Sequence, residues 1–523
     1  MKYTWNYCGS NNRSIFEQIR HNRNITDSFI YTSLADIPDV SLMKDLDKAS
    51  NRIIDAIHKK EKIIIYGHDD IDGITSTYIL FDFLEKMGSQ NHYYYIPNRM
   101  IESHGIHKKF IEKAKCEKYD LLITVDGGIS SYKAVADIQK SGCDVIITDH
   151  HLIQEETIPD AYAVINPKQK DCNYPFDMLA GVGITYFLIC KLAEKLNSKL
   201  NRDYLFWVAV GTIADKVPLN GVNRVLVKEV LDNWFTFNDK NLEKLKPYLW
   251  PALSHYNRMG SLKYIIKLLS SGRQSDGKNL TMKFLLTREN EKELIIQKLI
   301  ARQKEQEVKL KELHKHLKKI MPEKVENCFI YYDFGNDISF DFLGYCAAQV
   351  TKVHKIPAVF LKDKKGIVIG EARCAEGSNL VDAFAFCKEH LIQFGGHAQA
   401  AGFTAKKDDI HGFEQKFEEY IEQNKDTIND NRKINIDAVF TIDEFDKFDE
   451  YLQLDYHALQ PFGKGNPNPH FLLKNYLPER DSQRIRVKSS EYYLEPDEYY
   501  HLVFKLKGTS FKLVDHRKAN YLL

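Results

Sequence analysis

The sequence predicts an α/β protein whose first domain contains a largely parallel sheet, and three observations support this fold class. Short apolar segments alternate with helix-like segments between residues 46 and 225, which is the pattern of a doubly wound sheet. A second alternation of strands and helices begins near residue 326, after a strongly charged helical stretch. The chain has 523 residues, enough for several domains that each bury a core.

These patterns divide the chain into five parts. The expected parts are an N-terminal arm (1–45), the first α/β domain (46–225), a helical connector (226–325), a second, smaller α/β domain (326–430) and a C-terminal β-module (431–523). In the arm, we expect Tyr3, Trp5 and Tyr7 to pack on the first domain. The connector contains one long helix, because apolar residues recur at helical spacing in a charged segment that ends near Ile320.

The C-terminal module has the composition of a small β-barrel. Its short strands carry aromatic residues and lysines, a combination typical of modules that bind single strands by stacking and backbone charge. The alternative is a β-module whose tyrosines only form its core.

Composition limits the functional classes. The formal net charge is +1, so a nucleic-acid-binding surface would require a local concentration of positive charge. The nine cysteines form no CxxC pair and indicate reduced thiols, which predicts a cytoplasmic protein. The first residues lack the apolar core of a signal peptide, and no apolar run has the length of a membrane span. We therefore expect no membrane association.

The segment from Ile63 to Leu80 is the centre of the first domain. It predicts a buried strand over residues 62–66, an acidic turn over 67–73 and a helix from near 74 to 83. The turn places His68, Asp70 and Asp72 at the carboxyl end of a strand, where open α/β sheets bind their ligands. One aspartate there would only favour the helix N-terminus. Clustered carboxylates repel one another unless a cation lies between them, so this is a candidate metal edge.

The same arrangement recurs twice downstream. A second apolar strand ends in Asp126 and two glycines, and a third ends in Asp149, His150 and His151. Asp215 follows an apolar helix-like segment and approaches from the side. Because parallel strands end at one edge of a sheet, these residues would meet the acidic turn of the first strand. Carboxylates and imidazoles in this ratio suit a pair of Mn²⁺ or Mg²⁺ ions better than a zinc–thiolate site.

Seven segments stand out by their order and spacing. They are HDDIDG (68–73), IPNRMIESHG (96–105), VDGG (125–128), DHH (149–151), ADKVPL (214–219), FGGHAQAAGF (394–403) and PFGKGNPNPHF (461–471). Together they resemble the DHH phosphoesterase superfamily and, within it, the RecJ family of single-strand-specific exonucleases. The resemblance implies a DHH domain, a DHH-associated C-terminal domain and an OB-fold-like module in the first, second and third folded parts. The segment after Phe471 is short for a complete OB-fold.

The resemblance also implies an activity. It indicates a hydrolase with two Mn²⁺ or Mg²⁺ ions that releases mononucleotides from single-stranded DNA in the 5′ to 3′ direction, in DNA repair and recombination. RNA stays open as a substrate, and a single-strand-binding protein or a helicase is an expected partner. One alternative is a small-molecule phosphodiesterase for cyclic dinucleotides or very short RNA, against which the length of the chain argues. The other is a non-catalytic RecJ-like replication scaffold, which would not need a full set of buried polar ligands.

Each residue at the metal edge has an expected role. The expected metal ligands are His68, Asp70, Asp72, Asp126, His150 and Asp215. Asp126 ends the middle strand and is expected to bridge the ions, with His68 and Asp70 on one ion and the other three ligands on the second. RecJ sequences commonly have an aspartate at the position of His68, which we still expect to be a ligand. By the resemblance, Asp149 orients the neighbouring histidines, and His151 contacts the scissile phosphate or protonates the leaving oxygen.

A further group of residues is expected to contact the substrate. It comprises Arg273, Arg373, Gly395, Gly396 and His397. The two glycines allow the backbone to approach a phosphate, and His397 would donate to it from the start of a small-residue helix. The resemblance supports Arg373, although Ala372 and Cys374 replace the serines that usually flank it. Only Gly272 and Arg273 remain of a family NAAGR turn, so a surface arginine is the alternative there.

Two more glycines open a helix-like segment after the first domain's last strand. Gly181 and Gly183 are expected to serve close helix packing, without a chemical role.

Overall fold

The protein forms two compact units in a computed structural model. The structure describes residues 3–7, 13–98, 105–153, 158–249, 258–273, 279–321, 325, 327–375, 377–426, 433–483, 485, 487–488, 494–507 and 510–519. The larger unit comprises Ser10–Glu305 and Asp437–Leu523, and the smaller unit comprises Met1–Gly9 and Gln306–Ile436.

The larger unit contains the predicted parallel sheet, in the order β3-β2-β4-β5-β6. Its strands are β2 (Ile63–Tyr66), β3 (His92–Tyr95), β4 (Leu121–Val125), β5 (Asp144–Thr148) and β6 (Ala163–Ile165). All neighbouring pairs are parallel. The three strands that precede the acidic motifs, β2, β4 and β5, are adjacent. The α/β fold class predicted from the sequence is therefore confirmed.

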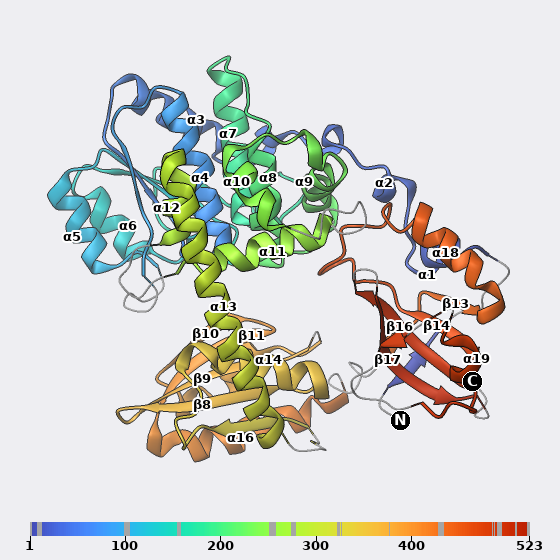
Figure 1. The fold of residues 1–523 in the computed structure, drawn as a ribbon. Helices are drawn as coiled ribbons and strands as arrows, with labels where there is room; N and C mark the ends of the chain where they lie inside the picture. Colours follow the sequence, from blue (N-terminus) through green and yellow to red (C-terminus); the bar gives the residue numbers. More distant parts are fainter. Residues whose placement is uncertain are drawn as a thin grey trace. The chain divides into compact units, whose positions relative to one another are not determined.

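Helices cover both faces of this sheet (Figure 1). On one face lie α5 (Lys108–Glu117) and α6 (Tyr132–Gln139), and on the other lie α3 (Leu46–His58), α4 (Ile71–Lys86) and α7 (Gly181–Lys195). Every residue of β2 is buried, and alternate side chains enter the two cores. Ile63 and Ile65 pack with α4 and α7, whereas Ile64 and Tyr66 pack with α5 and α6. A strand buried on both faces explains the continuous apolar sequence.

Helix α4 begins earlier than its expected start near residue 74. Its first residue is Ile71, because the Asp70 side chain accepts a hydrogen bond from the Gly73 N–H at 2.9 Å and caps the helix. Asp72 therefore lies in the first helical turn, with its side chain buried.

The larger unit continues as a helical layer that shares the core of α4 and α7. The helices are α8 (Tyr204–Asp215), α9 (Gly221–Asp232), α10 (Lys240–Leu245), α11 (Arg258–Ser270), α12 (Leu280–Leu286) and the first part of α13 (Glu289–Ile320), whose residues from Gln306 onward belong to the smaller unit. Helix α13 is the long charged helix expected from the sequence. In its first part, the Lys292 amine donates to Asn241 Oδ1 and Phe284 O, which anchors the helix in the core.

The smaller unit contains a mixed sheet in the order β10-β11-β9-β8-β7. Its elements are β7 (Phe329–Tyr332), α14 (Leu343–His354), β8 (Ala358–Lys364), β9 (Ile367–Arg373), α15 (Leu380–Phe386), β10 (Gln393–His397), β11 (Ala400–Lys406) and α16 (Ile410–Gln423). The small-residue helix expected after His397 is wrong, because this segment is strand β11. Strand β11 pairs with β10 on one side and β9 on the other, and its side chains Ala401, Phe403 and Ala405 are buried. This pairing overrides the low strand propensity of alanine and glycine.

Different segments of the N-terminal arm pack on different parts of the protein. Strand β1 (Thr4–Asn6) pairs in parallel with β12 (Lys433–Asn435) in the smaller unit. Helix α1 (Ile15–Asn22) inserts Ile15 and Ile19 into the core of the C-terminal module, and the short α2 (Asp27–Ile30) follows. Of the arm, Ile37, Val40 and Met43 pack on the core of the first domain. The expectation that Trp5 packs on that domain is wrong, because strand pairing holds Trp5 in the smaller unit.

The C-terminal module is a five-stranded sheet in the order β13-β14-β16-β17-β15. Its elements are β13 (Ala438–Thr441), α18 (Phe445–Leu454), β14 (Phe471–Tyr476), α19 (Pro478–Asp481), β15 (Val487–Lys488), β16 (Tyr500–Lys507) and β17 (Ser510–Lys518). Within the described residues, β13 and β15 are open edges, so the sheet is present but barrel closure is not shown.

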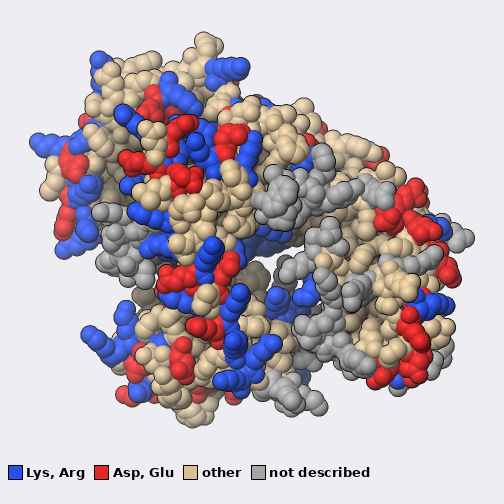
Figure 2. Space-filling view, in the orientation of Figure 1, with Lys and Arg blue, Asp and Glu red and all other residues tan. Residues whose placement is uncertain are grey.

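The charges of the molecule are mixed. Figure 2 shows basic and acidic side chains interspersed on the visible face, which agrees with the net charge of +1. Over the described residues, no helix is long and apolar enough to cross a membrane.

Candidate metal centre

Side chains from the ends of β2, β4 and β5 and from α8 converge at one edge of the parallel sheet. In each of three groups, the potential ligand atoms lie within 4.8 Å of one another. The groups are His68, Asp70 and Asp126; Asp72, His150 and Asp215; and Asp126, His150 and His151. All six expected metal ligands therefore lie in one cluster, and the sheet order produces the convergence predicted from the sequence.

Asp126 lies between the two sides of the cluster. It follows β4 in the left-handed conformation, with φ 57°, which turns its side chain into the edge. Its Oδ1 lies 3.2 Å from His150 Nε2, and its Oδ2 lies 3.7 Å from His68 Nδ1. Each carboxylate oxygen thus faces a different ligand group, which is the arrangement that a bridging ligand requires.

Asp72 is held by the N-terminus of helix α7. The backbone N–H groups of Gly181 and Val182 donate to its Oδ2 and Oδ1, each at 2.8 Å. Helix N-termini favour anions because their first N–H groups have no intrahelical acceptor. The remaining lone pairs of this carboxylate are available to the group that contains His150 and Asp215.

Gly181 has a role in the site that sequence reasoning missed. A Cβ atom at this position would lie 2.6 Å from Asp126 Oδ1, so only glycine allows α7 to approach both aspartates. Gly73 is similarly confined, because its Cβ would lie 2.3 Å from His68 Cβ. The role of Gly181 could have been suspected from the sequence, because a glycine begins a helix in a domain whose strands end in acidic residues.

Asp149 connects two loops below the cluster. Its Oδ1 accepts hydrogen bonds from the backbone N–H of His150 at 2.7 Å and of His151 at 2.9 Å, and lies 2.7 Å from His151 Nδ1. Its Oδ2 accepts from the Ile129 N–H at 2.9 Å, in the loop after Asp126. The carboxylate is therefore saturated by protein donors and fixes the orientation of His151.

A second pair of residues holds the same histidine loop from the other side. Asn166 Nδ2 donates to His151 O at 3.0 Å, and the Lys168 amine donates to His150 O. Both residues follow β6, the neighbour of β5 in the sheet. Their position in the sequence does not distinguish these two residues from other polar residues after the DHH motif, so their contacts were not predicted.

The electrostatics of the cluster favour cations. Burial and neighbouring carboxylates raise the pKa of Asp72 and Asp126 well above the usual range, and burial together with Asp70 raises the pKa of Asp215 to about 6. Asp126 Oδ1 and His150 Nε2 are buried and have no hydrogen-bond partner within the described part of the chain. Buried polar atoms left without partners are costly. These donor atoms therefore fit a pair of divalent cations.

The two histidines have opposite protonation preferences. Burial and the adjacent His151 lower the pKa of His150 to about 3, so His150 is neutral and can act as a ligand. Burial also opposes the charged form of His151, but the Asp149 carboxylate outweighs it and raises the pKa of His151 to about 9. Burial would raise the pKa of Asp149, but His151 and the hydrogen bonds to Asp149 lower it below the usual range. A cationic His151, 35% exposed, suits a phosphate.

Arg273 lies beside the loop that carries His68 and Asp70. Its Nε is 2.9 Å from Asp69 Oδ2, and its side chain is 44% exposed. Arg302 donates to the backbone oxygen of Arg273 at 2.9 Å, which fixes that backbone to α13. Asp69 was not singled out from the sequence, although it separates His68 from Asp70. The remainder of the expected turn, residues 274–277, lies outside the described residues.

The other expected substrate residues belong to the smaller unit. Arg373 ends β9, and its Nη1 contacts Glu371 Oε2 at 3.0 Å and Ala372 O at 2.7 Å. Gly395 and Gly396 lie in β10, opposite Gly402 and Ala401 of β11. At Gly396, φ is 137°, and a Cβ would lie 2.5 Å from Ala400 O. The side chain of His397 lies outside what the structure describes.

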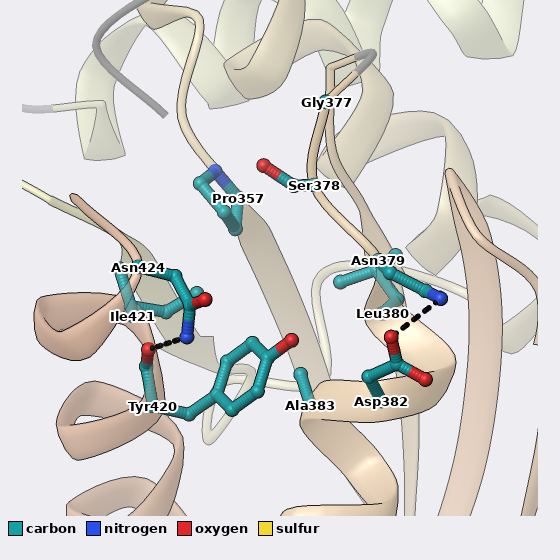
Figure 3. A pocket seen from close by; sticks show the side chains of 10 residues that line it. All are labelled: Pro357, Gly377, Ser378, Asn379, Leu380, Asp382, Ala383, Tyr420, Ile421 and Asn424. Atoms are coloured by element: carbon teal, nitrogen blue, oxygen red, sulfur yellow. Dashed lines mark hydrogen bonds between the residues drawn. The ribbon is translucent and has the colours of Figure 1, made fainter. Parts of the chain in front are cut away.

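The smaller unit also has a cavity of about 200 Å³ next to α15 (Figure 3). The Ser378 hydroxyl and the Tyr420 ring point toward it, and Asn379 Nδ2 donates to Asp382 Oδ2 at 2.8 Å on its wall. The lining contains one carboxylate and no cationic or imidazole side chain. It therefore has the chemistry of neither a phosphate site nor a site for two metal ions.

Comparison with known sequences gives relatives of one kind. Residues 62–212 match the DHH family, N-terminal domain. The single-stranded-DNA-specific exonuclease RecJ of Bacillus subtilis is 31% identical over 477 residues, which span 86% of this chain and 57% of that protein. RecJ of Haemophilus influenzae is 27% identical, with 82% of this chain and 77% of that protein covered. The chain thus spans little more than half the length of the Bacillus relative.

Solved structures share the fold of this chain. The crystal structure of RecJ from Thermus thermophilus in complex with Mn²⁺ superposes with a TM-score of 0.80 at 22% identity, covering 98% of this chain and 79% of that one. A manganese-bound exonuclease RecJ gives 0.62 at 26% identity, covering 76% of this chain and 98% of that one. The likeness therefore extends beyond the parallel sheet to nearly all of the chain.

Proposed function

We propose that this chain, which matches the DHH family over residues 62–212 and is similar to RecJ exonucleases over most of its length, is a metal-dependent exonuclease that acts on single-stranded DNA. The observation that carries the proposal is the convergence of six metal-binding side chains around Asp126, whose two oxygens face separate ligand groups. A protein that only served as a scaffold would gain nothing from burying these carboxylates together.

In the proposed mechanism, the residues of the edge have separate tasks. Two Mn²⁺ or Mg²⁺ ions, when bound, would activate a water and neutralise charge on the phosphate oxygens. Asp126 would contribute to both ions, His68 and Asp70 would hold one, and Asp72, His150 and Asp215 would hold the other. Backbone N–H groups of α7 keep Asp72 in place.

His151 would act on the phosphodiester itself. Its imidazolium is oriented through Nδ1 by Asp149, so Nε2 is the nitrogen that would contact a phosphate oxygen or the leaving oxygen. The 35% exposure of its side chain allows a strand to reach it. Arg273, already paired with Asp69, would hold the metal-binding loop and present its exposed edge to the substrate.

The smaller unit would bind the end of the strand. Arg373 and the backbone of Gly395 and Gly396 would contact a 5′-terminal phosphate, because a guanidinium and close backbone approach are suited to a phosphate group. We propose a 5′ to 3′ direction and release of mononucleotides by similarity to RecJ. A single-strand-binding protein or a helicase would supply the substrate during DNA repair and recombination.

The test is hydrolysis of a strand labelled at either end. Purified protein with Mn²⁺ should release labelled mononucleotide first from the 5′ end of a single-stranded oligodeoxynucleotide, and it should leave blunt duplex and circular single strands intact. A cyclic dinucleotide and an RNA strand of the same sequence serve as controls for the small-molecule alternative and for sugar preference. Rapid hydrolysis of the cyclic dinucleotide without cleavage of DNA would refute the proposed function.

A further inference from the structure

A turn of the C-terminal module lies against the loop that follows Asp215 in the larger unit. The turn runs from Gly463 to Asn466 and is closed by a hydrogen bond from the Gly463 N–H to Asn466 O at 2.8 Å. The Leu219 N–H donates to Lys464 O at 2.7 Å. Because Leu219 follows Asp215 by only four residues, the hydrogen bond ties the turn to the metal-binding edge.

The glycines of the turn are required by this contact. A Cβ at Gly463 would lie 2.7 Å from Leu219 Cδ1, and a Cβ at Gly465 would lie 3.1 Å from Pro218 Cβ. Gly465 also has φ 75°, which favours glycine. The buried Asn466 amide donates to Leu459 O and Pro461 O, each at 2.8 Å. The backbone of Lys464 is therefore held in one place at the tip of a closely packed turn.

The side chain of Lys464 is exposed, in contrast to the packed backbone around it. Within the described residues, Lys464 forms no ion pair, and its backbone is bonded to Leu219, four residues after Asp215. Lys168, another lysine beside the cluster, differs because its amine is already bonded to His150 O. Lys464 is thus a cation near the edge whose amine is available to an anion from outside.

We propose that Lys464 is a substrate-binding residue, whose ammonium contacts the backbone phosphate next to the scissile one in the strand that is retained. The inference rests on the proposed exonuclease function. A lysine ammonium is a compact point charge that suits a phosphate on a flexible strand. A phosphate in the retained strand is favoured because the other neighbouring phosphate is the 5′-terminal one, to which Arg373 is assigned. The turn therefore gives the C-terminal module a direct role at the site of cleavage.

The test compares Lys464→Ala with Lys464→Arg and with a control, Lys447→Ala. Lys447 is an exposed lysine of the same module that is paired with Glu444 at 3.3 Å. In Mn²⁺, kcat/KM is measured on a 5′-phosphorylated 12-nucleotide strand over a range of salt concentrations. Loss of one phosphate contact should make the slope of log kcat/KM against log salt shallower by about 0.7. We expect this change in Lys464→Ala, with recovery in Lys464→Arg and no change in Lys447→Ala.

A shorter substrate separates phosphate binding from an effect on the metal site. A 5′-phosphorylated dinucleotide has only the terminal and scissile phosphates, so Lys464→Ala and the unmodified protein should cleave it at equal rates. Equal losses on the dinucleotide and on the longer strand, weaker Mn²⁺ binding by Lys464→Ala, or an unchanged salt slope would each overturn the inference. In these last cases, the proposed function stands if the unmodified protein still cleaves single strands. Absence of any cleavage by the unmodified protein would overturn both.

Discussion

At the scale of single residues, the surroundings of the Asp126 carboxylate favour a bound cation. Its left-handed backbone and the surrounding core bury it completely, and neighbouring carboxylates raise its pKa well above the usual range. The same burial that makes the free anion costly strengthens its interaction with a bound cation. His150 and His68 approach different oxygens of this carboxylate, so the geometry supports two cation positions.

The substitution Asp149→Asn tests the orientation of the histidine loop. Asparagine keeps the shape of the side chain but has no charge. Its amide nitrogen cannot accept a hydrogen bond, so asparagine cannot serve both the N–H groups of His150 and His151 and the N–H group of Ile129. Loss of such an orienting group typically weakens metal binding or activity by about 10 to 100-fold. We expect a decrease of that size in kcat, measured at a temperature at which circular dichroism shows that the variant is folded, because the amide also leaves a buried N–H group without an acceptor and lowers stability. A variant with normal kcat would show that Asp149 is only structural.

Mn²⁺ affinity should depend on pH through the carboxylates. Ligands must be deprotonated to bind a metal, and the pKa of Asp215 is about 6 in the metal-free protein. His150, with a pKa of about 3, stays neutral over the same range and adds no dependence. The dissociation constant should therefore rise as the pH falls, by at least about tenfold per unit below pH 6, where Asp215 gains a proton that the metal must displace. Calorimetric titrations at several pH values check this, and a flat profile down to pH 5 would contradict it.

At the scale of elements, helix α7 is as much a part of the site as the strands that end there. Gly181 lets its first turn reach Asp72, while the helix buries the rest of its length in the core of the larger unit. A rigid helix held by many apolar contacts can position a ligand more accurately than a loop.

The variant Gly181→Ala should damage the metal centre without unfolding the protein. The new Cβ would be 2.6 Å from Asp126 Oδ1, so the helix or the aspartate must move. We expect a large loss of Mn²⁺ affinity and a loss of stability of about 1–3 kcal/mol. Gly183→Ala is the matched control in the same helix, because its Cβ would approach only the Leu179 side chain, at 3.3 Å. Equal Mn²⁺ affinities of the two variants would contradict the assigned role of Gly181.

The sequence allowed the strands and their acidic ends to be predicted, because apolar segments followed by polar turns are a local pattern. The contact of α7 with Asp72 joins residues more than 100 positions apart, so no local pattern contains it. We expected a helix where strand β11 lies, because its sequence is rich in small residues. Alanine and glycine have no strand preference of their own, and the pairing with β10 and β9 determines the conformation of this segment. The DHH resemblance is confirmed, whereas the roles of the individual site residues stay predictions.

At the scale of the whole molecule, the residues expected to contact the metal ions and the substrate are distributed over the two units. The metal cluster belongs to the larger unit, and Arg373 and the β10–β11 strands belong to the smaller one. The Arg373 side chain is 28% exposed and paired with Glu371, which restrains its guanidinium. The family's flanking serines are absent, so the arginine and the backbone would carry recognition of the phosphate.

Recognition of the terminal phosphate predicts an effect that depends on the substrate. Arg373→Ala should slow cleavage of a 5′-phosphorylated strand by about tenfold, the loss of roughly one charge-assisted hydrogen bond. The same variant should be no slower than the unmodified protein on a strand with a 5′ hydroxyl. Rates on the two strands, measured side by side, decide the matter. An equal loss on both strands would mean that Arg373 does not bind the terminal phosphate.

The most direct test of the metal centre is the number of Mn²⁺ ions bound by the protein and by the variant Asp126→Asn. Because Asp126 is placed to contribute to both ligand groups, neutralising it should weaken both sites together. We expect calorimetry to show two bound ions per chain for the unmodified protein and magnetic resonance to show that the two ions are coupled. In correctly folded Asp126→Asn, binding should be at least about 100-fold weaker, and hydrolysis of single-stranded DNA should be lost. Two ions bound with unchanged affinity by Asp126→Asn, or nuclease activity retained in that variant, would contradict the bridging role.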